Sequence, residues 1–234
     1  MELFTPYQTM KESVKSIPPT SNVKLLIRHS CRPSLKGIKN PDTCGLTAEG
    51  IEVATKFGRS LPFKIGKCFS SPILRCTETI KAMTQIPFDS INISDVLGYS
   101  FVDDNNIAQK YFTEMNLKQL VFLMIRQYKV EGFITKEEGV RNILDLMFSV
   151  SGRNGYLDIY CTHDIHLAIM DSVIFSNYDS VDSIRDNWPN MLEGMWFWGD
   201  RMDFYVVWRG EVRHCKLNGI ANSGYSTPFK NHNL

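Results

Sequence analysis

Arg28, His29 and Arg32 follow directly after a short, mainly apolar run at residues 23–27. A neutral imidazole nitrogen can act as a nucleophile, and the forked donors of two guanidinium groups suit the oxygens of a phosphate. Ligand sites of α/β proteins lie at the carboxyl ends of strands, where these side chains stand if the apolar run is a buried strand. The chemistry that these residue types predict is phosphoryl transfer through a phosphohistidine.

A second cluster lies at Ser71, Pro72 and Arg75, where an apolar run ending at Phe69 passes into a helical pattern. Proline suits a first helical turn, and Ser71 suits the cap before it. Arg75 then stands at the positive end of the helix dipole, which is an unfavourable place for a cation. A bound phosphate would relieve that conflict, because helix N-termini attract anions.

A third cluster, His163 and Asp164, follows the alternating segment at residues 156–162 and precedes another helical pattern. His166 lies three residues after His163, a spacing that also occurs in metal-binding pairs, but no cysteine or carboxylate cluster completes such a site. We therefore expect no metal and no cofactor. Three strand ends that each carry a phosphate-binding group are better explained by one shared site than by three unrelated structural roles.

Short apolar runs bounded by breakers alternate with amphipathic patterns along most of the chain. This order predicts an α/β fold, a three-layer α/β/α sandwich with a mixed, mostly parallel sheet whose strand order stays open. In the helix that follows Thr47, Ile51, Ala54 and Phe57 are predicted to face the core. The other predicted elements are strands at 23–28, 65–69 and 156–162, a meander from residue 191 with a tight turn at 208–211, and helices at 72–83, 136–150 and 163–175.

Residues 86–135 have a less regular pattern, with helices predicted near 107–115 and 117–128. We interpret this stretch as a cap or lid inserted over the mouth of a single domain that spans residues 1–234. Loops that select substrates tend to lie at such a mouth.

The 234 residues carry a net charge of +1, so no overall field favours nucleic acid or an anionic membrane. No apolar run approaches the roughly 18 residues of a membrane-spanning helix, and the polar first residues lack the apolar core of a secretory signal. None of the six cysteines is arranged as CxxC, which argues against zinc and thioredoxin-like sites. We expect a cytoplasmic protein without nucleic-acid or membrane partners, and its oligomeric state is not indicated.

Four segments resemble motifs of one protein family. Arg28-His29-Ser30 matches an Arg-His-Gly motif except for the serine, and Arg32 adds an RHxxR spacing. The other segments are LTAEG at 46–50, SSPILRCTETI at 70–80 and THDIHLAIM at 162–170, which resemble LTxxG, SSPLxRAxQTA and HDxNL. On these matches the chain resembles the histidine phosphatase superfamily, which includes phosphoglycerate mutases and histidine acid phosphatases.

The resemblance implies a phosphoglycerate mutase-like fold and a metal-independent phosphatase that hydrolyses a phosphomonoester through a phosphohistidine on His29. The substrate would be a small molecule, with a phosphoprotein as the other open class. The groups implied to hold the phosphate oxygens are Arg28, Arg32, Arg75 and His163. Ser71 is predicted to contribute to substrate binding as well. The acid phosphatase branch implies Asp164 as the general acid that protonates the leaving alkoxide.

The general acid has a second set of candidates, because the mutase-like branch takes a glutamate from the region after the SSP helix. That region offers Asp95, Asp103, Asp104 and Glu114. Two alternative functions also stay open, a phosphomutase of the phosphoglycerate mutase type and a catalytically weak module that binds phosphate or phosphoproteins. Ser30 supports the second, because the glycine of the motif permits a close backbone approach and unusual dihedral angles.

Overall fold

The computed structural model describes residues 4–127, 129–178 and 180–217. Its strands are β1 Val23–Arg28, β2 Lys64–Ser70, β3 Asn92–Ile93, β4 Tyr156–Thr162, β5 Gly194–Gly199, β6 Asp203–Trp208 and β7 Glu211–Lys216. They form one sheet in the order β3-β2-β4-β1-β5-β6-β7. The first four strands of that order run parallel, and the last three form an antiparallel meander beside β1. The mixed, mostly parallel sheet predicted from the sequence is confirmed.

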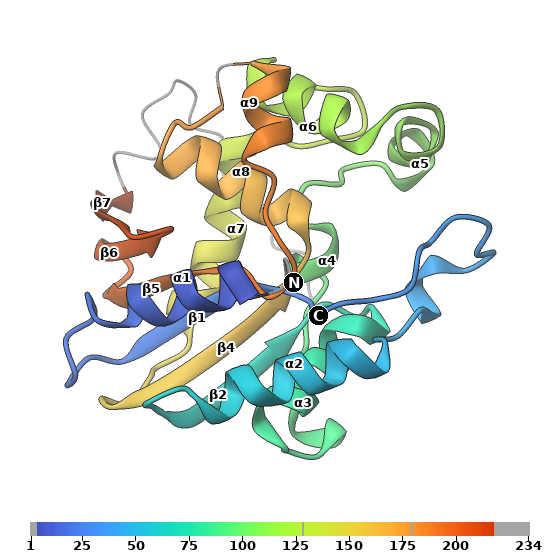
Figure 1. The fold of residues 1–234 in the computed structure, drawn as a ribbon. Coiled ribbons are helices and arrows are strands. Elements are labelled where there is room, and N and C mark those ends of the chain that lie inside the picture. The colour runs from blue at the N-terminus through green and yellow to red at the C-terminus, as the bar shows by residue number, and fades with distance from the viewer. Residues whose placement is uncertain (1–3, 128, 179, 218–234) are drawn as a thin grey trace.

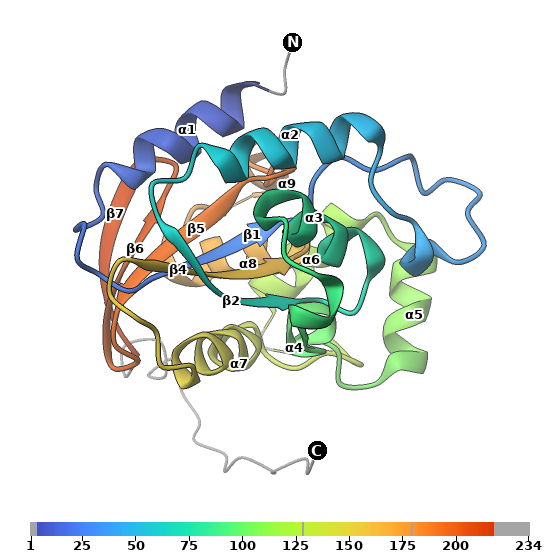
Figure 2. The same cartoon turned by 90° about the horizontal axis from the view of Figure 1, so that it is seen from below.

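Helices cover both faces of this sheet (Figure 1). They are α1 Phe4–Val14, α2 Ala48–Arg59, α3 Leu74–Thr84, α4 Val96–Tyr99, α5 Asn105–Glu114, α6 Leu117–Arg126, α7 Lys136–Ser149, α8 Asp164–Ile174 and α9 Val181–Asp186, with 3-10 turns at Pro41–Thr43 and Phe88–Ser90. Figure 2 shows α1 and α2 on one side of the sheet and α7 on the other. Two hydrophobic cores, one on each side, confirm the three-layer sandwich.

β1 is the central strand, and all of its residues are buried. Leu25 and Ile27 belong to the core under α1, α2 and α3, whereas Leu26 belongs to the core under α7 and α8. β1 and β4 are parallel neighbours, with Arg28 in register with Thr162. Both strands therefore end at the same edge of the sheet, and the residues that follow them lie side by side.

Helix α2 begins as predicted, with Oγ1 of Thr47 accepting a hydrogen bond from the backbone N–H of Gly50 at 3.0 Å. Ala54 and Phe57 are buried in the core, as predicted. Ile51 is 47% exposed, so its predicted core position is wrong. The buried stripe of the helix runs through Gly50 instead, where the backbone of a neighbouring loop packs closely.

Helix α3 begins at Leu74, with Ile73 as its N-cap residue and no side-chain capping bond. The predicted cap at Ser71 is therefore wrong. Oγ of Ser71 still accepts a hydrogen bond from the backbone N–H of Ile73 at 3.3 Å and also lies 2.9 Å from Nε2 of His163, but the chain enters the helix only at Leu74. The side chains of Cys76 and Ile80 are buried on the inner face of the helix, as its spacing predicts.

The stretch at 86–135 contains β3, α4, α5 and α6. The last two confirm the helices predicted there, although Tyr128, at the end of the second prediction, lies outside the described residues. α6 contacts α8 and α9, and Figure 1 shows α5 and α6 away from the sheet. The interpretation of this stretch as a lid stays a prediction.

The hairpin of β6 and β7 turns at Arg209 and Gly210, whose φ angles are 50° and 85°. Trp208 pairs with Glu211 across this turn, which confirms the predicted tight turn. Two positive φ angles are typical of a type I′ hairpin turn, in which glycine or asparagine usually stands at the first position. In the described ranges of the chain, no helix is both long enough and apolar enough to cross a membrane.

Candidate active site

The end of β1 places Arg28 between Asp164 and the segment that precedes β5. Its Nη1 donates to the carbonyl oxygen of Pro189 at 2.6 Å, and its Nη2 forms an ion pair with Oδ2 of Asp164 at 2.7 Å. The Nε of Arg28 is buried and has no hydrogen-bond partner among the described residues. This guanidinium group therefore keeps a donor for one more acceptor.

His29 is buried, and its Nδ1 lies 2.8 Å from the carbonyl oxygen of Ser30. A carbonyl oxygen only accepts, so in the neutral ring Nδ1 carries the proton and Nε2 keeps its lone pair. Burial, and then the positive charges of Arg28 and Arg75, lower the pKa of His29 to about 3. The imidazole is therefore uncharged at neutral pH, and this is the form that can attack phosphorus.

Ser30 stands where the family motif has glycine, and its hydroxyl points to α2. Oγ donates to the carbonyl oxygen of Gly50 at 2.7 Å, and the backbone N–H of Ser30 donates to Oγ1 of Thr79 at 2.9 Å. The φ angle of Ser30 is not positive, so its backbone conformation does not require glycine. The serine is thus accommodated by contacts with α2 and α3.

The LTAEG segment holds the loop that follows His29. The backbone N–H of Thr47 donates to the carbonyl oxygen of Cys31 at 3.0 Å. A Cβ atom on Gly50 would lie 2.2 Å from that same oxygen, which real Cβ atoms do not approach. The threonine therefore binds the loop while the glycine makes room for it.

Ser71 and Arg75 meet His163 at the end of β4. Oγ of Ser71 lies 2.9 Å from Nε2 of His163, and Nη2 of Arg75 lies 3.4 Å from Nδ1. A guanidinium only donates, so Nδ1 is the acceptor and Nε2 carries the proton. Burial lowers the pKa of His163 and favours this uncharged form. Nη1 of Arg75 also donates to the carbonyl oxygen of Pro41 at 2.9 Å, which fixes the guanidinium group.

Asp164 begins α8, and each of its carboxylate oxygens has a donor. Oδ1 accepts from the backbone N–H of Ile165 at 3.0 Å, and Oδ2 accepts from Nε1 of Trp188 at 3.2 Å as well as from Arg28. Burial alone would raise the pKa of this carboxyl group, but Arg28 and Trp188 outweigh burial and the pKa is lowered. In this arrangement Asp164 is an ionised carboxylate.

Arg32 lies half-buried near the other two guanidinium groups. Burial, and then the charges of Arg75 and Arg28, lower its pKa. Its Nε and the Nε of Arg75 are buried without a hydrogen-bond partner in the described part of the chain. The rings of His29 and His163 are 5.5 Å apart. One cluster thus contains the predicted site residues Arg28, His29, Arg32, Ser71, Arg75, His163 and Asp164, whose catalytic and binding roles stay predictions.

Three of the alternative acids have contacts of their own outside this cluster, although Asp103 also lines the groove described below. Asp103 forms an exposed ion pair with Lys129 at 3.5 Å. Asp104 caps α5, with its Oδ1 accepting from the backbone N–H of Asn106 at 2.8 Å. Glu114 is exposed at the end of α5. These contacts indicate structural or solvated positions.

Asp95, the fourth alternative, lies closer to the cluster. The backbone N–H of its neighbour Ser94 donates to the carbonyl oxygen of Ser70 at 2.9 Å, next to the Ser71 corner. Asp95 and Tyr99 line a polar groove of ≈ 550 Å³. The Tyr99 hydroxyl donates to Oδ2 of Asp42 at 3.4 Å, beside the carbonyl that Arg75 contacts. The groove therefore opens near the Arg75 side of the cluster.

His166 is buried behind His163, and neither of its ring nitrogens has a hydrogen-bond partner among the described residues. Its ring lies 5.9 Å from that of His163 and 5.3 Å from that of Phe101. Burial lowers the pKa of His166 to about 4. Within residues 4–127, 129–178 and 180–217, no group of three or more His, Cys, Asp or Glu side chains is arranged to hold a metal ion.

Sequence reasoning missed three contributors to this cluster. Thr79 accepts from the Ser30 backbone, and its Oγ1 donates to the carbonyl oxygen of Arg75 at 2.7 Å. Trp188 and Pro189 come from a loop far along the chain and contact Asp164 and Arg28. Thr79 belongs to the SSPILRCTETI segment and could have been found there. The Trp-Pro pair offered only a weak signal, an aromatic residue with a polar tip inside a loop.

No family model matches the sequence, and no curated protein matches it. Solved structures match the fold. YhfR of Bacillus stearothermophilus has a TM-score of 0.55 at 15% identity, over 82% of this chain and 98% of its own. A phosphoserine phosphatase mutant from Entamoeba histolytica has a TM-score of 0.53 at 14% identity, over 82% and 94%. A mycobacterial glucosyl-3-phosphoglycerate phosphatase has a TM-score of 0.52 at 10% identity, over 82% and 100%.

These structures have a phosphoglycerate mutase-like fold, and this chain shares that fold. The likeness confirms the fold that the sequence motifs imply. At identities of 10–15% it shows the fold alone, so activity and substrate must be argued from the cluster itself.

Proposed function

We propose that the protein is a metal-independent phosphatase that hydrolyses a phosphomonoester through a phosphohistidine intermediate on His29. The observation that carries this proposal is the setting of His29, an uncharged imidazole beside three guanidinium groups whose Nε donors are buried and unpartnered within the described residues. Buried donors without partners are rare in native proteins. A phosphate dianion offers enough acceptors to satisfy several of them at once.

In the first step, Nε2 of His29 attacks phosphorus, and the bond between phosphorus and the ester oxygen breaks. Catalysis of this step is mainly positioning and stabilisation of negative charge. The hydrogen bond from Nδ1 to the Ser30 carbonyl orients the ring, and Arg28, Arg32 and Arg75 provide the positive charge. His163 completes the set of donors once it binds a proton together with the dianion.

Asp164 is the proposed general acid, although its pKa is lowered in the free site. A phosphate dianion competes with Asp164 for the charge of Arg28, and its own negative charge disfavours a nearby carboxylate. Substrate binding therefore raises the pKa of Asp164 and favours uptake of a proton from solvent. The acid then gives this proton to the leaving alkoxide as the ester bond breaks.

In the second step, water attacks the phosphorus of phosphohistidine, and the bond between phosphorus and Nε2 breaks. The ionised Asp164 left by the first step takes a proton from that water, and inorganic phosphate forms. His29 returns to its uncharged state, and its lone pair is again available. When phosphate leaves, Asp164 returns its proton to solvent, so atoms and protons balance over the whole cycle.

The proposed substrate is a small-molecule phosphomonoester. Two of the structural neighbours act, by their names, on phosphoserine and on glucosyl-3-phosphoglycerate. In this chain the groove lined by Asp95, Tyr99 and neighbouring polar residues lies on the Arg75 side of the cluster and has room for a polar leaving group. A phosphoprotein remains the alternative class of substrate.

No contact in the cluster favours the phosphomutase over the hydrolase. The binding module depended on Ser30, whose hydroxyl is bonded to Gly50 and whose backbone needs no glycine. We therefore retain hydrolysis as the proposal.

The test is phosphate release from an aryl phosphate with EDTA present, between about pH 4 and 8, where histidine and perturbed carboxyl groups titrate. We expect wild type to be active and to yield an acid-labile phosphoenzyme that His29→Ala lacks. His214→Ala is the matched control, because this exposed histidine pairs with Asp203 on the outer strands and should keep full activity. A wild type that binds phosphate but forms neither product nor phosphoenzyme contradicts the proposal.

The acid is identified by comparing an aryl ester, whose leaving group needs little protonation, with an alkyl ester, whose alkoxide needs it. Asp164→Asn is expected to lose about 100-fold in kcat on the alkyl ester and much less on the aryl ester. Asp95→Asn serves as the comparison variant. If that variant shows the selective loss instead, the acid is Asp95 and the role given to Asp164 is wrong.

A further inference from the structure

The segment at residues 187–194, here called the strap, joins α9 to β5 and lies against the end of β1. The backbone N–H of Arg28 donates to the carbonyl oxygen of Glu193 at 2.9 Å, and the N–H of Leu192 donates to the carbonyl oxygen of His29 at 3.4 Å. The carbonyl oxygen of Pro189 accepts from Nη1 of Arg28 at 2.6 Å. The strap thus contacts both the backbone and the guanidinium group at the catalytic end of β1.

The strap also contacts the proposed acid. Nε1 of Trp188 donates to Oδ2 of Asp164 at 3.2 Å, on the same oxygen that pairs with Arg28. One short segment therefore determines where both members of the Arg28–Asp164 pair lie.

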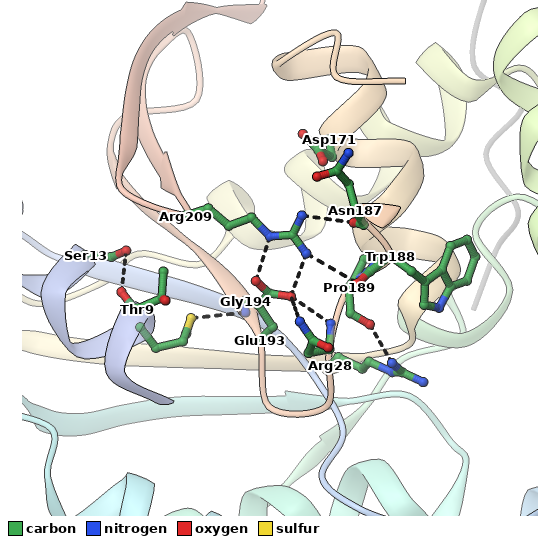
Figure 3. A network of polar contacts seen from close by, with 12 residues as sticks. Thr9, Ser13, Arg28, Asp171, Asn187, Trp188, Pro189, Glu193, Gly194 and Arg209 are labelled. Atoms are coloured by element: carbon green, nitrogen blue, oxygen red, sulfur yellow. Dashed lines mark hydrogen bonds and ion pairs between the residues drawn. The ribbon is translucent and has the colours of Figure 1, made fainter. Parts of the chain in front are cut away.

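A single side chain from the distant β6–β7 turn fastens the strap (Figure 3). Nε and Nη2 of Arg209 pair with the two carboxylate oxygens of Glu193 at 2.7 Å and 2.9 Å. Nη1 of Arg209 donates to the carbonyl oxygen of Asn187 at 3.0 Å, and Nη2 also contacts that of Trp188 at 3.4 Å. Arg209 therefore holds the beginning and the end of the strap together, and Glu193 is only 4% exposed.

Positive φ angles occur at Arg209 and at Leu192, the residue before Glu193. Leu192, within the strap, has a φ of 58° although it is a buried leucine. Arg209 has a φ of 50° at a turn position that favours glycine or asparagine. Each such residue costs roughly 1–2 kcal/mol, and such strain persists where the surrounding structure holds it, commonly at functional sites.

We propose that the Arg209–Glu193 pair is a clasp that positions Arg28 and Asp164 through the strap, with Trp188 holding the acid directly. Arg209, Glu193 and Trp188 are positioning residues, and none of them needs to touch the substrate. The proposal rests on the proposed function and gives the C-terminal meander a part in it.

The groups that face Asp164 come from several elements. They are Arg28, His29, Arg32, His163, His166 and the indole N–H of Trp188. Replacing Trp188 removes one donor to the carboxylate and leaves the charged groups in place. The pKa of Asp164 should then rise, because hydrogen bonds to the charged form of a group favour that form.

Two variants test the clasp, each with a matched control. Arg209→Met removes the guanidinium group that contacts both carboxylate oxygens of Glu193. Its control, Arg213→Met, lies on the same hairpin and removes an arginine that pairs with Glu211 instead. Trp188→Phe removes the indole donor, and Trp198→Phe does the same at a tryptophan stacked on Tyr205 in the meander. For Arg209→Met we expect kcat/KM to fall by about 100-fold, since a small displacement of positioned groups has that effect.

Two measurements separate positioning from a general loss of structure. The ¹⁵N–¹H signals of the Arg28 guanidinium group should be resolved and slowly rotating in wild type, and averaged in Arg209→Met. The pH above which kcat declines should rise by about 1 in Trp188→Phe, because a hydrogen bond to a charged group has about that effect on a pKa. Arg213→Met and Trp198→Phe should leave both observables as in wild type.

The inference is overturned if the Arg28 signals and the pH profile are the same in the strap variants as in the controls. Should Arg209→Met fail to fold, Arg209→Lys takes its place, since it keeps the charge and loses the two-point contact with Glu193. The guanidinium signals are recorded without turnover. An inactive wild type with no phosphoenzyme would therefore reject the proposed function while the clasp is still tested.

Discussion

Two buried ion pairs lie at opposite ends of β1. One joins β1 to its neighbour β4, and the other joins β1 to α8, the helix that follows β4. Lys24 pairs with Asp158, its register neighbour on β4, at 3.3 Å. Arg28 pairs with Asp164 at 2.7 Å at the opposite end. Both pairs lie in a protein interior where isolated charges are costly. They differ in what happens to the remaining polar atoms of each partner.

We call the Lys24–Asp158 pair closed, because the polar atoms of both side chains have further hydrogen-bond partners within the protein. Nζ of Lys24 also donates to the carbonyl oxygen of Val150 at 3.2 Å. Oδ1 of Asp158 accepts from the backbone N–H of Lys67 at 2.8 Å, and its Oδ2 contacts Nδ2 of Asn22 at 3.5 Å. The hydrogen bond to Lys67 lies between Ile65 and Cys68, where the register of β2 shifts against β4, so it holds the two strands together at that irregularity. The pair serves the sheet, and both Nζ of Lys24 and the two carboxylate oxygens of Asp158 have hydrogen-bond partners.

The Arg28–Asp164 pair is open. The Nε atoms of Arg28, Arg32 and Arg75 lack partners among the described residues, and the two aromatic nitrogens of His166 do so as well. Stability alone favours satisfying such atoms. The two buried ion pairs therefore differ in their surroundings, because unpaired donors lie around the pair at the candidate site, whereas Lys24 and Asp158 each have further partners.

The largest effect is expected from breaking the open pair. Arg28→Met should lower kcat/KM by about 10³–10⁵, the range reported for arginines that stabilise a transferring phosphoryl group. Steady-state kinetics on an aryl phosphate measures it. Arg201→Met, at an exposed pair with Asp145, is the control and should stay within about twofold of wild type. Equal losses in both variants would refute a special role for Arg28.

Breaking the closed pair should affect stability instead. Asp158→Ala leaves the buried Lys24 ammonium and the Lys67 N–H without their acceptor, which should lower the free energy of unfolding by about 3–5 kcal/mol. Asp145→Ala, at the exposed pair, should lower it by less than about 1 kcal/mol. Urea unfolding measures both. If the kcat of folded Asp158→Ala drops as far as that of Arg28→Met, the two ends are not functionally distinct.

Short-range signals in the sequence predicted much of the end of the sheet that carries the candidate site. Short apolar runs located β1 and β2, an alternating segment located β4, and phosphate-binding residue types stood at each strand end. Capping chemistry located the start of α2 correctly. It failed at Ser71, whose Oγ bonds the N–H of Ile73 just before the helix begins at Leu74 and also contacts a distant partner, His163. Local rules cannot anticipate such a contact.

Other features depend on contacts between distant segments, and no local pattern predicts them. Arg209 and Glu193 are ordinary charges in a hairpin turn and a loop, and only the sheet order brings them together. The closed pair did carry a signal. A charge inside a fully buried strand, such as Lys24, must find a partner, and Asp158 stands at the same kind of position in β4.

Acidification should lower the free energy of unfolding through His166, which is buried behind His163 at the open end. Burial lowers the pKa of His166 to about 4 in the folded protein, whereas an unfolded histidine titrates near 6.5. Between these values the unfolded chain binds a proton that the folded chain does not, so stability falls as pH falls. From this group we expect a loss of about 2 kcal/mol between about pH 7.5 and pH 5.

His166→Leu removes the titrating ring and should reduce that loss by about 2 kcal/mol in urea unfolding at the two pH values. His29 and His163, whose pKa values are lowered too, still contribute in this variant. An unchanged slope in His166→Leu would show that the buried ring is not the acid-sensitive group.

The smallest effect is expected at Ser30, which lies at the open end yet is itself satisfied. Its hydroxyl donates to Gly50 and its N–H to Thr79, so Ser30→Gly loses one buried hydrogen bond and gains chain entropy when unfolded. We expect a loss of about 1 kcal/mol in the free energy of unfolding, and kcat/KM within about twofold of wild type. A large gain in kcat in Ser30→Gly would mean that the serine restrains catalysis. A residue whose polar groups are all hydrogen-bonded would then affect activity as the unpaired groups beside it do, and the contrast between the two kinds of group would be wrong at this end of the sheet.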